Sequence, residues 1–335
     1  MSERLKVGVI GLGVGAEHAR AFAAHPACEV VALCDRDPAR LGEWASILPD
    51  ARRYVEADRL IDDSGLAVVV IASQDDDHYR QVVRALGAGK HVFAEKPLCL
   101  DGGELHDIAR AWRASGRRLS TNTVLRRSAR FRWLKDAVQS GRLGRVFLIE
   151  GDYVYGRLHK LIDGWRGGIP NYSVMMGGGI HVVDMVLWLA DERPVEVSAV
   201  RSDLGSRDTG FAGHDLVAAV LRFDSGLVAR IGANFASVHP HYHAFAVHGT
   251  AATFENTPTG DARLWTSRDW REPPAPVTAA YPGVRKGDLV PAFVDAVLGR
   301  GEPDVTEAEA FAAVAVCLAI DRAAAERQTL QVQYV

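Results

Sequence analysis

A lysine at the end of a short apolar run is the first residue of this chain that could do chemistry. Residues 91–94 read HVFA, which suits a buried strand, and Glu95, Lys96 and Pro97 follow. Open α/β sheets bind ligands at the carboxyl ends of their strands, so Lys96 is expected beside a ligand. Pro97 restricts the backbone of Lys96 to extended or turn geometry. A surface Glu-Lys pair that merely closes a strand is the alternative interpretation.

A glycine-rich turn near the N-terminus has a pattern that binds dinucleotides. Residues 11–16 read GLGVGA and directly follow the strand-like run 5–10, LKVGVI. Two glycines spaced in this way permit a tight turn and the close approach of a pyrophosphate. The helix that follows offers its free N–H groups and the positive end of its dipole. Cofactor contacts are therefore expected at Gly11, Gly13, Val14 and Gly15.

An acid after the second strand indicates which dinucleotide binds. The run 29–34, EVVALC, ends at Asp35, close to the offset of about 20 residues at which an acid meets the adenosine ribose. A carboxylate there accepts hydrogen bonds from the ribose hydroxyls and repels a 2′-phosphate, which favours NAD. Arg36 could stack on adenine or tolerate that phosphate, so NADP stays open. Asp37 and Pro38 supply the cap and first residue of the next helix, which leaves Asp35 for the ligand.

Strand and helix patterns alternate from residue 5 to about residue 123. The run 67–72, AVVVIA, is apolar throughout, as expected of a strand buried on both faces. Ser73 follows it, and His78 begins the next helix, so both are expected near the nicotinamide half of the cofactor. A histidine in a first turn is more often structural. Residues 1–123 are predicted to form an α/β Rossmann domain with a doubly wound parallel sheet.

Long strands in near succession begin at about residue 145. They are predicted at 146–155, 195–203, 216–223, 227–235 and 244–248, with a hairpin turn at 224–226. Residues 124–335 are therefore predicted to form an α+β domain with a large, mostly antiparallel, open-faced sheet. Helices cover one face of such a sheet, and a second subunit is the expected cover of the other. Residues 271–276 are expected to form a loop.

A glycine triplet that leads to a histidine is the second candidate site. Residues 177–179 are all glycine, which permits close approach of a ligand, and His181 and Asp184 share a face of the helix that follows. No further ligand lies at zinc spacing, so no metal is expected. His181 is interpreted as catalytic, with a buried structural histidine as the alternative. Asp184 is interpreted as orienting His181 or bonding to the backbone.

Two other polar groups are expected to be solvated. Three alternating histidines favour a solvated or inter-subunit face over a metal site: His239, His241 and His243. The densest basic cluster is expected on the solvated face of an amphipathic helix: Arg126, Arg127, Arg130 and Arg132.

Composition and charge narrow the functional classes. The 335 residues are 48% hydrophobic and carry a formal net charge of −3, which is typical of a globular chain of two domains. The charges are mixed, so neither nucleic acid nor a membrane is expected as a partner. The four cysteines have no metal-type spacing and are expected to be buried in a reducing compartment. The sequence shows no signal peptide, and a cytoplasmic location is expected.

Together these motifs resemble those of the Gfo/Idh/MocA oxidoreductases, which include glucose–fructose oxidoreductase and inositol dehydrogenase. The glycine loop, Asp35, the stretch AGKHVFAEKPL and the stretch GGGIHVVD carry the resemblance over nearly the whole chain. The resemblance implies hydride transfer between NAD or NADP and a hydroxyl or carbonyl of a sugar, polyol or sugar derivative. It also implies a homodimer or homotetramer formed through the C-terminal sheet.

The resemblance also implies roles for individual residues. Lys96 would lie between nicotinamide and substrate, with Glu95 also at the cofactor, and His181 would face the reacting hydroxyl. Family members often carry an aspartate four residues before this histidine, where this chain has Gly177. Further residues are expected to contact substrate: Asn122, Arg126, Tyr153, Trp165, Arg166, Tyr172 and Asp184. Two alternatives stay open, an NAD-dependent glycosidase that uses transient oxidation and a non-catalytic sensor of NAD and sugar.

Overall fold

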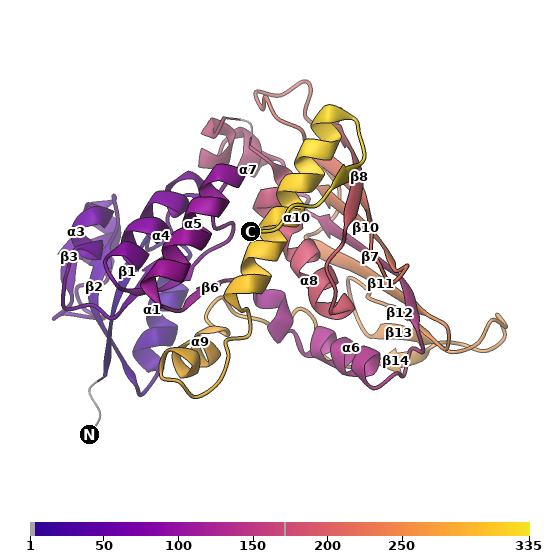
Figure 1. The fold of residues 1–335 in the computed structure, drawn as a ribbon, viewed down its shortest axis with the longest axis horizontal. Coiled ribbons are helices and arrows are strands. Elements are labelled where there is room, and N and C mark those ends of the chain that lie inside the picture. Colours follow the sequence, from indigo (N-terminus) through magenta and orange to yellow (C-terminus); the bar gives the residue numbers. More distant parts are fainter. Residues whose placement is uncertain (1–3, 171) are drawn as a thin grey trace. The chain divides into compact units, whose positions relative to one another are not determined.

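The computed structural model describes residues 4–170 and 172–335, which form two compact units (Figure 1). The first unit contains the chain up to Val124, together with Arg285–Phe311 and Val335. The second contains Leu125–Val284 and Ala312–Tyr334. The sequence patterns place everything after residue 123 in the second domain and do not show that residues 285–311 return to the first unit.

A six-stranded parallel sheet forms the first unit. The strands lie in the order β3-β2-β1-β4-β5-β6. They are β1 (Leu5–Ile10), β2 (Cys28–Cys34), β3 (Arg52–Tyr54), β4 (Val68–Ile71), β5 (His91–Ala94) and β6 (Leu119–Thr121). The connecting helices are α1 (Gly15–Ala24), α2 (Pro38–Glu43), α3 (Ala57–Ile61), α4 (His78–Gly87) and α5 (Gly102–Ser115). The order reverses beside β1, which confirms the predicted doubly wound fold.

Helix α9 (Val290–Val297) completes the core of the first unit. Phe293 on this helix is fully buried, and its ring lies 5.3 Å from that of Phe93 on β5 and 6.4 Å from that of Phe22 on α1. Edge-to-face and tilted aromatic contacts of this kind add to the free energy of burial. The returning segment also accepts a hydrogen bond from Ser120 at the Val305 carbonyl, 2.8 Å away.

A nine-stranded sheet forms the second unit. Its order is β14-β13-β12-β11-β7-β10-β9-β8-β15, and the β7–β10 pair is parallel whereas the other pairs are antiparallel. The strands are β7 (Val146–Val154), β8 (Glu196–Ser202), β9 (Leu216–Arg222), β10 (Val228–Asn234), β11 (Tyr242–Gly249), β12 (Thr253–Glu255), β13 (Ala262–Trp265), β14 (Ala275–Val277) and β15 (Leu330–Gln331). The predicted mostly antiparallel sheet is confirmed. Residues 275 and 276, expected in a loop, instead belong to the edge strand β14 (Ala275–Val277).

Helices cover one face of this sheet. They include α6 (Ala129–Gln139), α8 (Ile180–Ala190) and α10 (Glu307–Glu326), whereas the short α7 (His159–Ile162) follows β7 (Figure 1). On the covered face, alternate strand residues such as Ile149, Ile231 and Val247 are at most 1% exposed. On the opposite face, Val200 is 69% and Val220 49% exposed. The sheet therefore has one apolar covered face and one open face.

The open face also carries an ion-pair network. Arg230 donates to Glu150 at 2.8 Å and to Asp152 at 3.0 Å, and His248 lies 3.0 Å from Glu150. The hydrogen bond from Arg230 is the main cause that lowers the pKa of the Glu150 carboxyl. This face thus combines exposed valines with fixed charges.

Two predictions about solvated residues are wrong in part: Arg132, His239 and His241 are exposed as expected, whereas three other members of the two groups are buried. Arg126 and Arg130 are 4% and 3% exposed. Arg130 donates to the Ala279 and Gly260 carbonyls at 2.9 and 2.6 Å. These loop carbonyls supply the hydrogen bonds that a buried guanidinium needs. His243 is 6% exposed and lies on the covered face of β11, because Phe245 and Val247 of the same strand parity are buried there.

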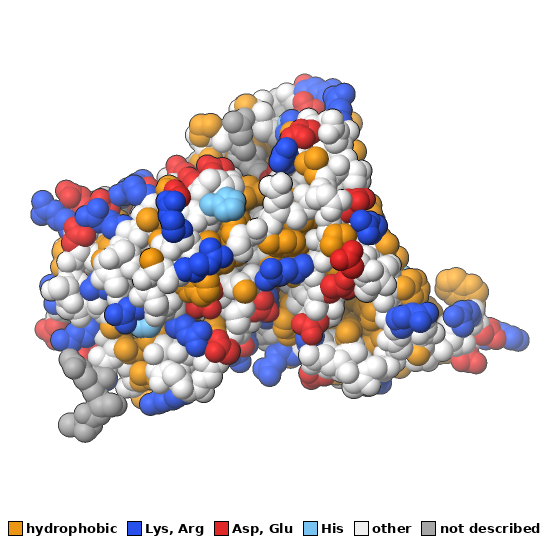
Figure 2. Space-filling model, in the orientation of Figure 1, with side chains coloured by type: hydrophobic (Ala, Val, Ile, Leu, Met, Phe, Trp, Pro, Cys, Tyr) orange, Lys and Arg blue, Asp and Glu red, His pale blue; other side chains and the backbone are white. Residues whose placement is uncertain are grey.

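Charged side chains of both signs lie on the face that Figure 2 draws, and basic and acidic side chains are intermixed there. The four cysteines are free and buried, as predicted. Within residues 4–170 and 172–335, no helix is long and apolar enough to cross a membrane.

Candidate active site

The glycine loop between β1 and α1 has the geometry of a phosphate cradle. Gly11 has φ +82°, and a Cβ atom there would lie 2.2 Å from the Ala72 carbonyl oxygen, so only glycine fits. Gly13 is exposed, and a Cβ there would meet only the end of the Arg40 side chain at 3.3 Å. Val14 at the N-cap of α1 gives no side-chain cap to the helix. The loop therefore presents backbone and a helix N-terminus that fit a pyrophosphate.

Asp35 binds this loop as well as facing the ribose position. Its Oδ2 atom accepts from the Leu12 N–H at 2.7 Å, and its Oδ1 atom accepts from the Asp37 N–H at 2.9 Å. Asp37 caps α2 through the Ala39 N–H, as predicted. A carboxylate has further lone pairs on each oxygen, so these two bonds leave acceptor capacity for ribose hydroxyls. Asp35 thus fixes the loop and keeps the chemistry expected of an NAD-binding acid.

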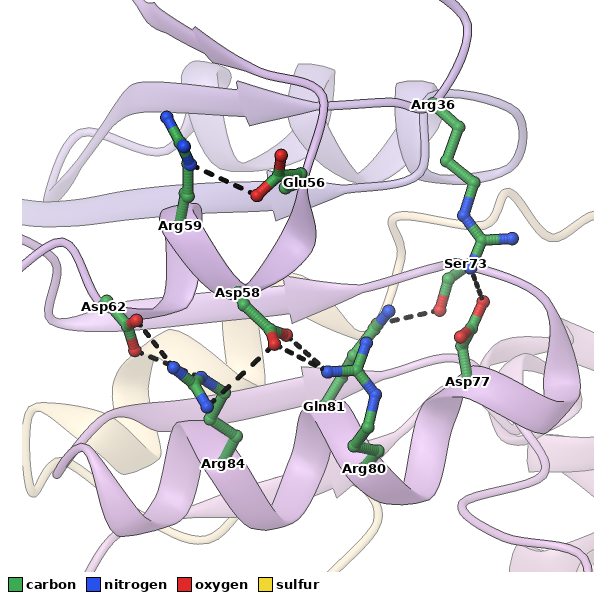
Figure 3. Close-up of polar contacts among 10 residues, drawn as sticks. All are labelled: Arg36, Glu56, Asp58, Arg59, Asp62, Ser73, Asp77, Arg80, Gln81 and Arg84. Atoms are coloured by element: carbon green, nitrogen blue, oxygen red, sulfur yellow. Dashed lines mark hydrogen bonds and ion pairs between the residues drawn. The ribbon is translucent and has the colours of Figure 1, made fainter.

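The neighbouring polar residues are arranged along the carboxyl ends of β2 and β4. Figure 3 shows Arg36 paired with Asp77 at 2.6 Å and Ser73 donating to Gln81 at 2.8 Å. Arg36 is exposed, whereas Ser73 is half-buried. A second set of ion pairs in the same view joins α3 to α4: Asp58 with Arg80, and Asp62 with Arg84. The contacts of Arg36 and Ser73 with cofactor stay predictions.

A buried carboxylate lies at the carboxyl end of β5. Glu95 is 7% exposed, and its Oε1 atom accepts from His18 at 2.9 Å and from Asn122 at 2.8 Å. Burial raises the pKa of the Glu95 carboxyl, but the charge of Lys286, the His18 bond and the charge of Lys96 outweigh it and hold the pKa well below its ordinary value. Glu95 is therefore an anion beside Lys96, which is 8% exposed.

His78 and Asn122 support this strand end. The His78 ring is fully buried, with Nδ1 at 2.6 Å from the Pro97 carbonyl and Nε2 at 3.2 Å from the Ser73 carbonyl. Both ring nitrogens face backbone carbonyls, which agrees with the structural alternative for His78, and its contact with cofactor stays a prediction. Asn122 is also fully buried and donates to Glu95, so it helps to hold that carboxylate, and its contact with substrate stays a prediction.

The glycine triplet of the second unit forms a π-helical turn, Met175–Gly179, that leads into α8. A Cβ on Gly178 would lie 2.4 Å from the Tyr153 ring, and one on Gly179 would lie 2.4 Å from the Met175 Sδ atom. These contacts explain why the turn is built from glycine. Such π turns are frequent at functional sites. His181 follows at the second position of α8 and is 7% exposed.

Aromatic rings surround His181 on the covered face of the sheet. The Tyr153 ring stacks on it at 6.1 Å and 20°, and the His243 ring lies 6.3 Å away. The backbone N–H of His243 donates to the Tyr281 hydroxyl oxygen at 2.8 Å. Burial and the neighbouring Tyr155 raise the pKa of Tyr153, so its hydroxyl stays neutral. No group of three or more His, Cys, Asp or Glu side chains in the described ranges could hold a metal ion.

Arg126 and Asp184 form a buried ion pair. The guanidinium donates to the two carboxylate oxygens at 2.9 and 2.7 Å, and Asp184 is 1% exposed. Two-point pairing of this kind is geometrically specific. The pair joins the segment before α6 to α8, which agrees with the structural interpretation of Asp184. Substrate contacts of either residue stay predictions.

The remaining predicted substrate residues lie in the segment between β7 and α8. Trp165 and Arg166 are half-buried in a 3₁₀ turn, Trp165–Gly168, with the Arg166 guanidinium 4.2 Å from the centroid of the Trp165 ring. Tyr172 is 5% exposed. Among the residues that the sequence did not single out are His18 and Lys286 around Glu95, and Tyr281 beside His243. His18 has a detectable signal, because it follows the glycine loop on the face of α1 with Gly15 and Ala19, both buried.

Asp321 supports the glycine turn from α10. Ser173 donates to its carboxylate at 2.5 Å and accepts from the Met176 N–H at 3.0 Å. Burial raises the pKa of Asp321 to about 6, against smaller lowering by the Ser173 bond and Arg201. Its folded-state pKa is thus above the unfolded value of about 3.9.

Replacement of Gly11 by alanine should disrupt dinucleotide binding. The added Cβ would overlap the Ala72 carbonyl, so the loop must move away from the phosphate position, and we expect NAD affinity to fall at least about tenfold. Gly116→Ala is the matched control, since Gly116 has φ +62° with nothing within 4 Å. It should lose about 1–2 kcal/mol of stability but keep its NAD affinity. Calorimetric titration measures the NAD affinity of both variants. A wild-type affinity in Gly11→Ala would contradict the role of this loop in binding the phosphates.

Stability should fall as pH rises through the titration of Asp321. Between about pH 4 and 6 the unfolded chain has released this proton while the folded chain still holds it, so a rise in pH favours unfolding. Asp321→Asn should remove this fall and leave the variant more stable than the wild type at pH 7.5. We expect about 1–2 kcal/mol after allowance for solvent screening. Urea unfolding at pH 4.5 and 7.5 measures the change, with the exposed Asp136→Asn as control; equal pH dependence in all three proteins would contradict it.

Comparison with known proteins agrees with the geometry of both units. The description "Oxidoreductase family, NAD-binding Rossmann fold" matches residues 5–123, and "GFO/IDH/MocA C-terminal domain" matches residues 131–255. The chain is 27% identical over 314 residues to the 1,5-anhydro-D-fructose reductase of Ensifer adhaerens, covering 91% of each chain. It is 30% identical over 198 residues to the inositol 2-dehydrogenase 2 of Saccharopolyspora erythraea, covering 58% of this chain and 56% of that one.

A solved structure of levoglucosan dehydrogenase in complex with NADH shares the fold, with a TM-score of 0.86, 22% identity, and coverage of 99% of this chain and 100% of that one. The family descriptions match one unit each and together account for most of the chain. The glycine loop, Asp35 and the Glu95-Lys96-Pro97 strand end are the features expected of them. This chain therefore belongs to the Gfo/Idh/MocA family of NAD-binding oxidoreductases.

Proposed function

We propose that this chain is a dehydrogenase or reductase that transfers hydride between NAD and a CH–OH or carbonyl group of a sugar, polyol or sugar derivative. The observation that carries the proposal is the buried, ionised Glu95 beside Lys96 at the carboxyl end of a Rossmann strand. Strongly perturbed charged groups at such a position are typical of functional sites. The names of the relatives, a reductase of an anhydro-sugar and an inositol dehydrogenase, support the substrate class. NADP stays a second possibility beside NAD.

The chain's own residues have to move one proton. Bound NAD supplies the acceptor for the hydride that leaves the substrate carbon. As the carbonyl forms, the hydroxyl proton must pass to a base, and we assign this proton to His181 and Lys96. An imidazole has an ordinary pKa near ~6.5, which suits general-base work at neutral pH. Lys96 serves either as the base or as a donor that stabilises the developing alkoxide.

Aromatic and guanidinium groups supply the substrate contacts in this proposal. Tyr153 is buried against His181, and the stacked pair of Trp165 and Arg166 is half-buried in the segment that follows β7. The apolar C–H faces of a sugar or inositol pack on aromatic rings, while its hydroxyls accept from a guanidinium.

Loss of either proton-handling group should remove most turnover. Lys96→Met and His181→Asn should each lower kcat by roughly 10²–10⁴-fold, because that is the usual contribution of positioned acid–base groups, while NAD still binds. Lys6→Met and His106→Asn are matched controls, since both residues are exposed and should leave kcat unchanged. The measurement is the NADH absorbance band during incubation with sugars, inositols and sugar acids, with NAD and NADP in parallel.

The same assay separates this proposal from its alternatives. A net, substrate-linked change of the NADH band supports a dehydrogenase. Sugar release without net NADH change would indicate a glycosidase, and NAD binding with neither change would indicate a sensor. Near-normal turnover of Lys96→Met would contradict the role of that lysine even if the dehydrogenase assignment holds.

We also propose that a second copy of the chain covers the open face of the nine-stranded sheet. The face carries exposed valines between fixed charges, a combination suited to a specific interface. Light scattering should show a homodimer or homotetramer. Val200→Asp combined with Val220→Asp should shift it toward monomer, whereas Val238→Asp, at a fully exposed loop residue, should not. A monomeric wild type at micromolar concentration would contradict the interface.

A further inference from the structure

Two arginines of the segment that follows β7 lie over aromatic rings. The guanidinium carbon of Arg157 is 5.2 Å from the centroid of the Tyr155 ring, and that of Arg166 is 4.2 Å from the centroid of the Trp165 ring. A cation–π contact holds such a side chain without using its N–H groups as hydrogen-bond donors. The rings therefore fix both cations and satisfy none of their donors.

Both guanidiniums act on Tyr153, whose ring stacks on that of His181. Burial raises the pKa of the Tyr153 hydroxyl most strongly, whereas the charges of Arg166 and Arg157 lower it. The Tyr153 ring stacks on the Tyr155 ring at 5.5 Å and 24°, and on the His181 ring at 6.1 Å and 20°. A row of three rings thus connects the Arg157 guanidinium with the histidine that we assign to proton transfer.

The segment that carries these arginines is positively charged. Residues 155–168 contain Arg157, Lys160 and Arg166, and Asp163 is their one acid. Among residues 4–170 and 172–335, the Arg157 side chain has no hydrogen-bond acceptor and no ion-pair partner, and Asp163 forms no ion pair. A surface lined by one sign of charge attracts ligands of the opposite sign. The segment is therefore suited to an anion.

A neutral substrate would not explain the placement of Arg157. Several arginines of the chain meet a carboxylate of the protein itself, as Arg80 meets Asp58 and Arg84 meets Asp62, each at 2.6 Å. At Arg157 the described chain supplies no such group, although a ring holds the side chain. A charge-assisted hydrogen bond to an anionic ligand is roughly twice as strong as one between neutral groups. A ligand that brings its own anion would use this side chain fully.

We propose that Arg157 and Arg166 bind an anionic substituent of the substrate, a carboxylate or a phosphate, while His181 handles the proton of the reacting hydroxyl. The inference rests on the proposed function and narrows its substrate class to acidic sugars and polyols. A guanidinium donates two parallel N–H bonds to a carboxylate or phosphate, so two guanidiniums suit a group with two or three terminal oxygens.

Probes with one ring and different charge give the first test. Glucose, glucuronate and glucose 6-phosphate differ only at the exocyclic carbon, and each is titrated calorimetrically into the enzyme saturated with NADH. We expect at least one of the two anions to bind at least about tenfold more tightly than glucose. The preference should shrink at about 1 M salt, and the better anion identifies the group. Glucose that binds as tightly as both anions would refute the proposal.

Removal of either guanidinium is the second test. Arg157→Met and Arg166→Met should each raise the Kd of the favoured anion roughly 10–100-fold, and Arg157→Met should leave the Kd of glucose unchanged. Arg157→Lys keeps the charge without the two-point geometry and should give an intermediate Kd. Arg142→Met is the matched control, because the exposed Arg142 lies 5.1 Å from the Trp133 ring centroid and should not affect any probe. A wild-type anion Kd in folded Arg157→Met would contradict the site.

Turnover separates this inference from the proposed function. Equal kcat/KM for neutral and anionic carbohydrates, unaltered in Arg157→Met, would overturn the anion site and leave the dehydrogenase assignment. Anion binding that is lost in Arg157→Met, without turnover of any carbohydrate, would overturn the proposed function and leave the anion site. Both measurements use the same NADH absorbance assay and the same calorimetric titrations.

Discussion

The ionised carboxylate of Glu95 is the constraint around which the end of strand β5 is built. A buried charge without partners costs several kcal/mol, so its surroundings must supply donors and positive charge. His18 and Asn122 donate to one of its oxygens, and the charges of Lys286 and Lys96 act on it. These residues come from α1, from the end of β6 and from the segment before α9. The need to satisfy one carboxylate thus ties the returning segment 285–311 to the sheet and fixes the backbone that carries Lys96.

In the second unit, close packing shapes the glycine turn that precedes His181. Each glycine of the triplet meets a different neighbour, Tyr172 at Gly177 and Tyr153 at Gly178, so two phenol rings reach the turn that precedes the histidine. Both rings are buried, and the raised pKa of Tyr153 keeps its hydroxyl neutral. Charged groups lie around Glu95 at the end of β5, whereas the rings of Tyr153 and His243 lie near His181 in the second unit.

The elements predicted from the sequence are those that local patterns determine. An apolar run of parallel-strand type, a glycine turn with a required positive φ at Gly11, and the Asp37 cap each depend on a few neighbouring residues, and each is present. The alternation of strand and helix was enough to give the doubly wound sheet. The glycine triplet correctly indicated that other atoms lie close to this backbone. The sequence did not show that these atoms belong to side chains of the protein itself. Local periodicity also gave the long strands of the second sheet, but not the short edge strand β14, whose proline-rich sequence is ordinarily typical of a loop.

The errors concern residues whose role depends on partners far along the chain. Arg126 reads as a solvated cation in its own segment, yet its partner Asp184 is 58 residues away and both are buried. For His78, helix position alone does not show that two backbone carbonyls face its ring. The pair of Tyr172 and Gly177 shows the same limit within one segment. In a regular helix residues five apart do not meet, and only the extended entry and the π-helical turn bring the phenol onto the glycine. Taken alone, Gly177 shows only that the family's aspartate is absent from this position. The structure shows in addition that the Tyr172 ring leaves no room for a side chain at residue 177.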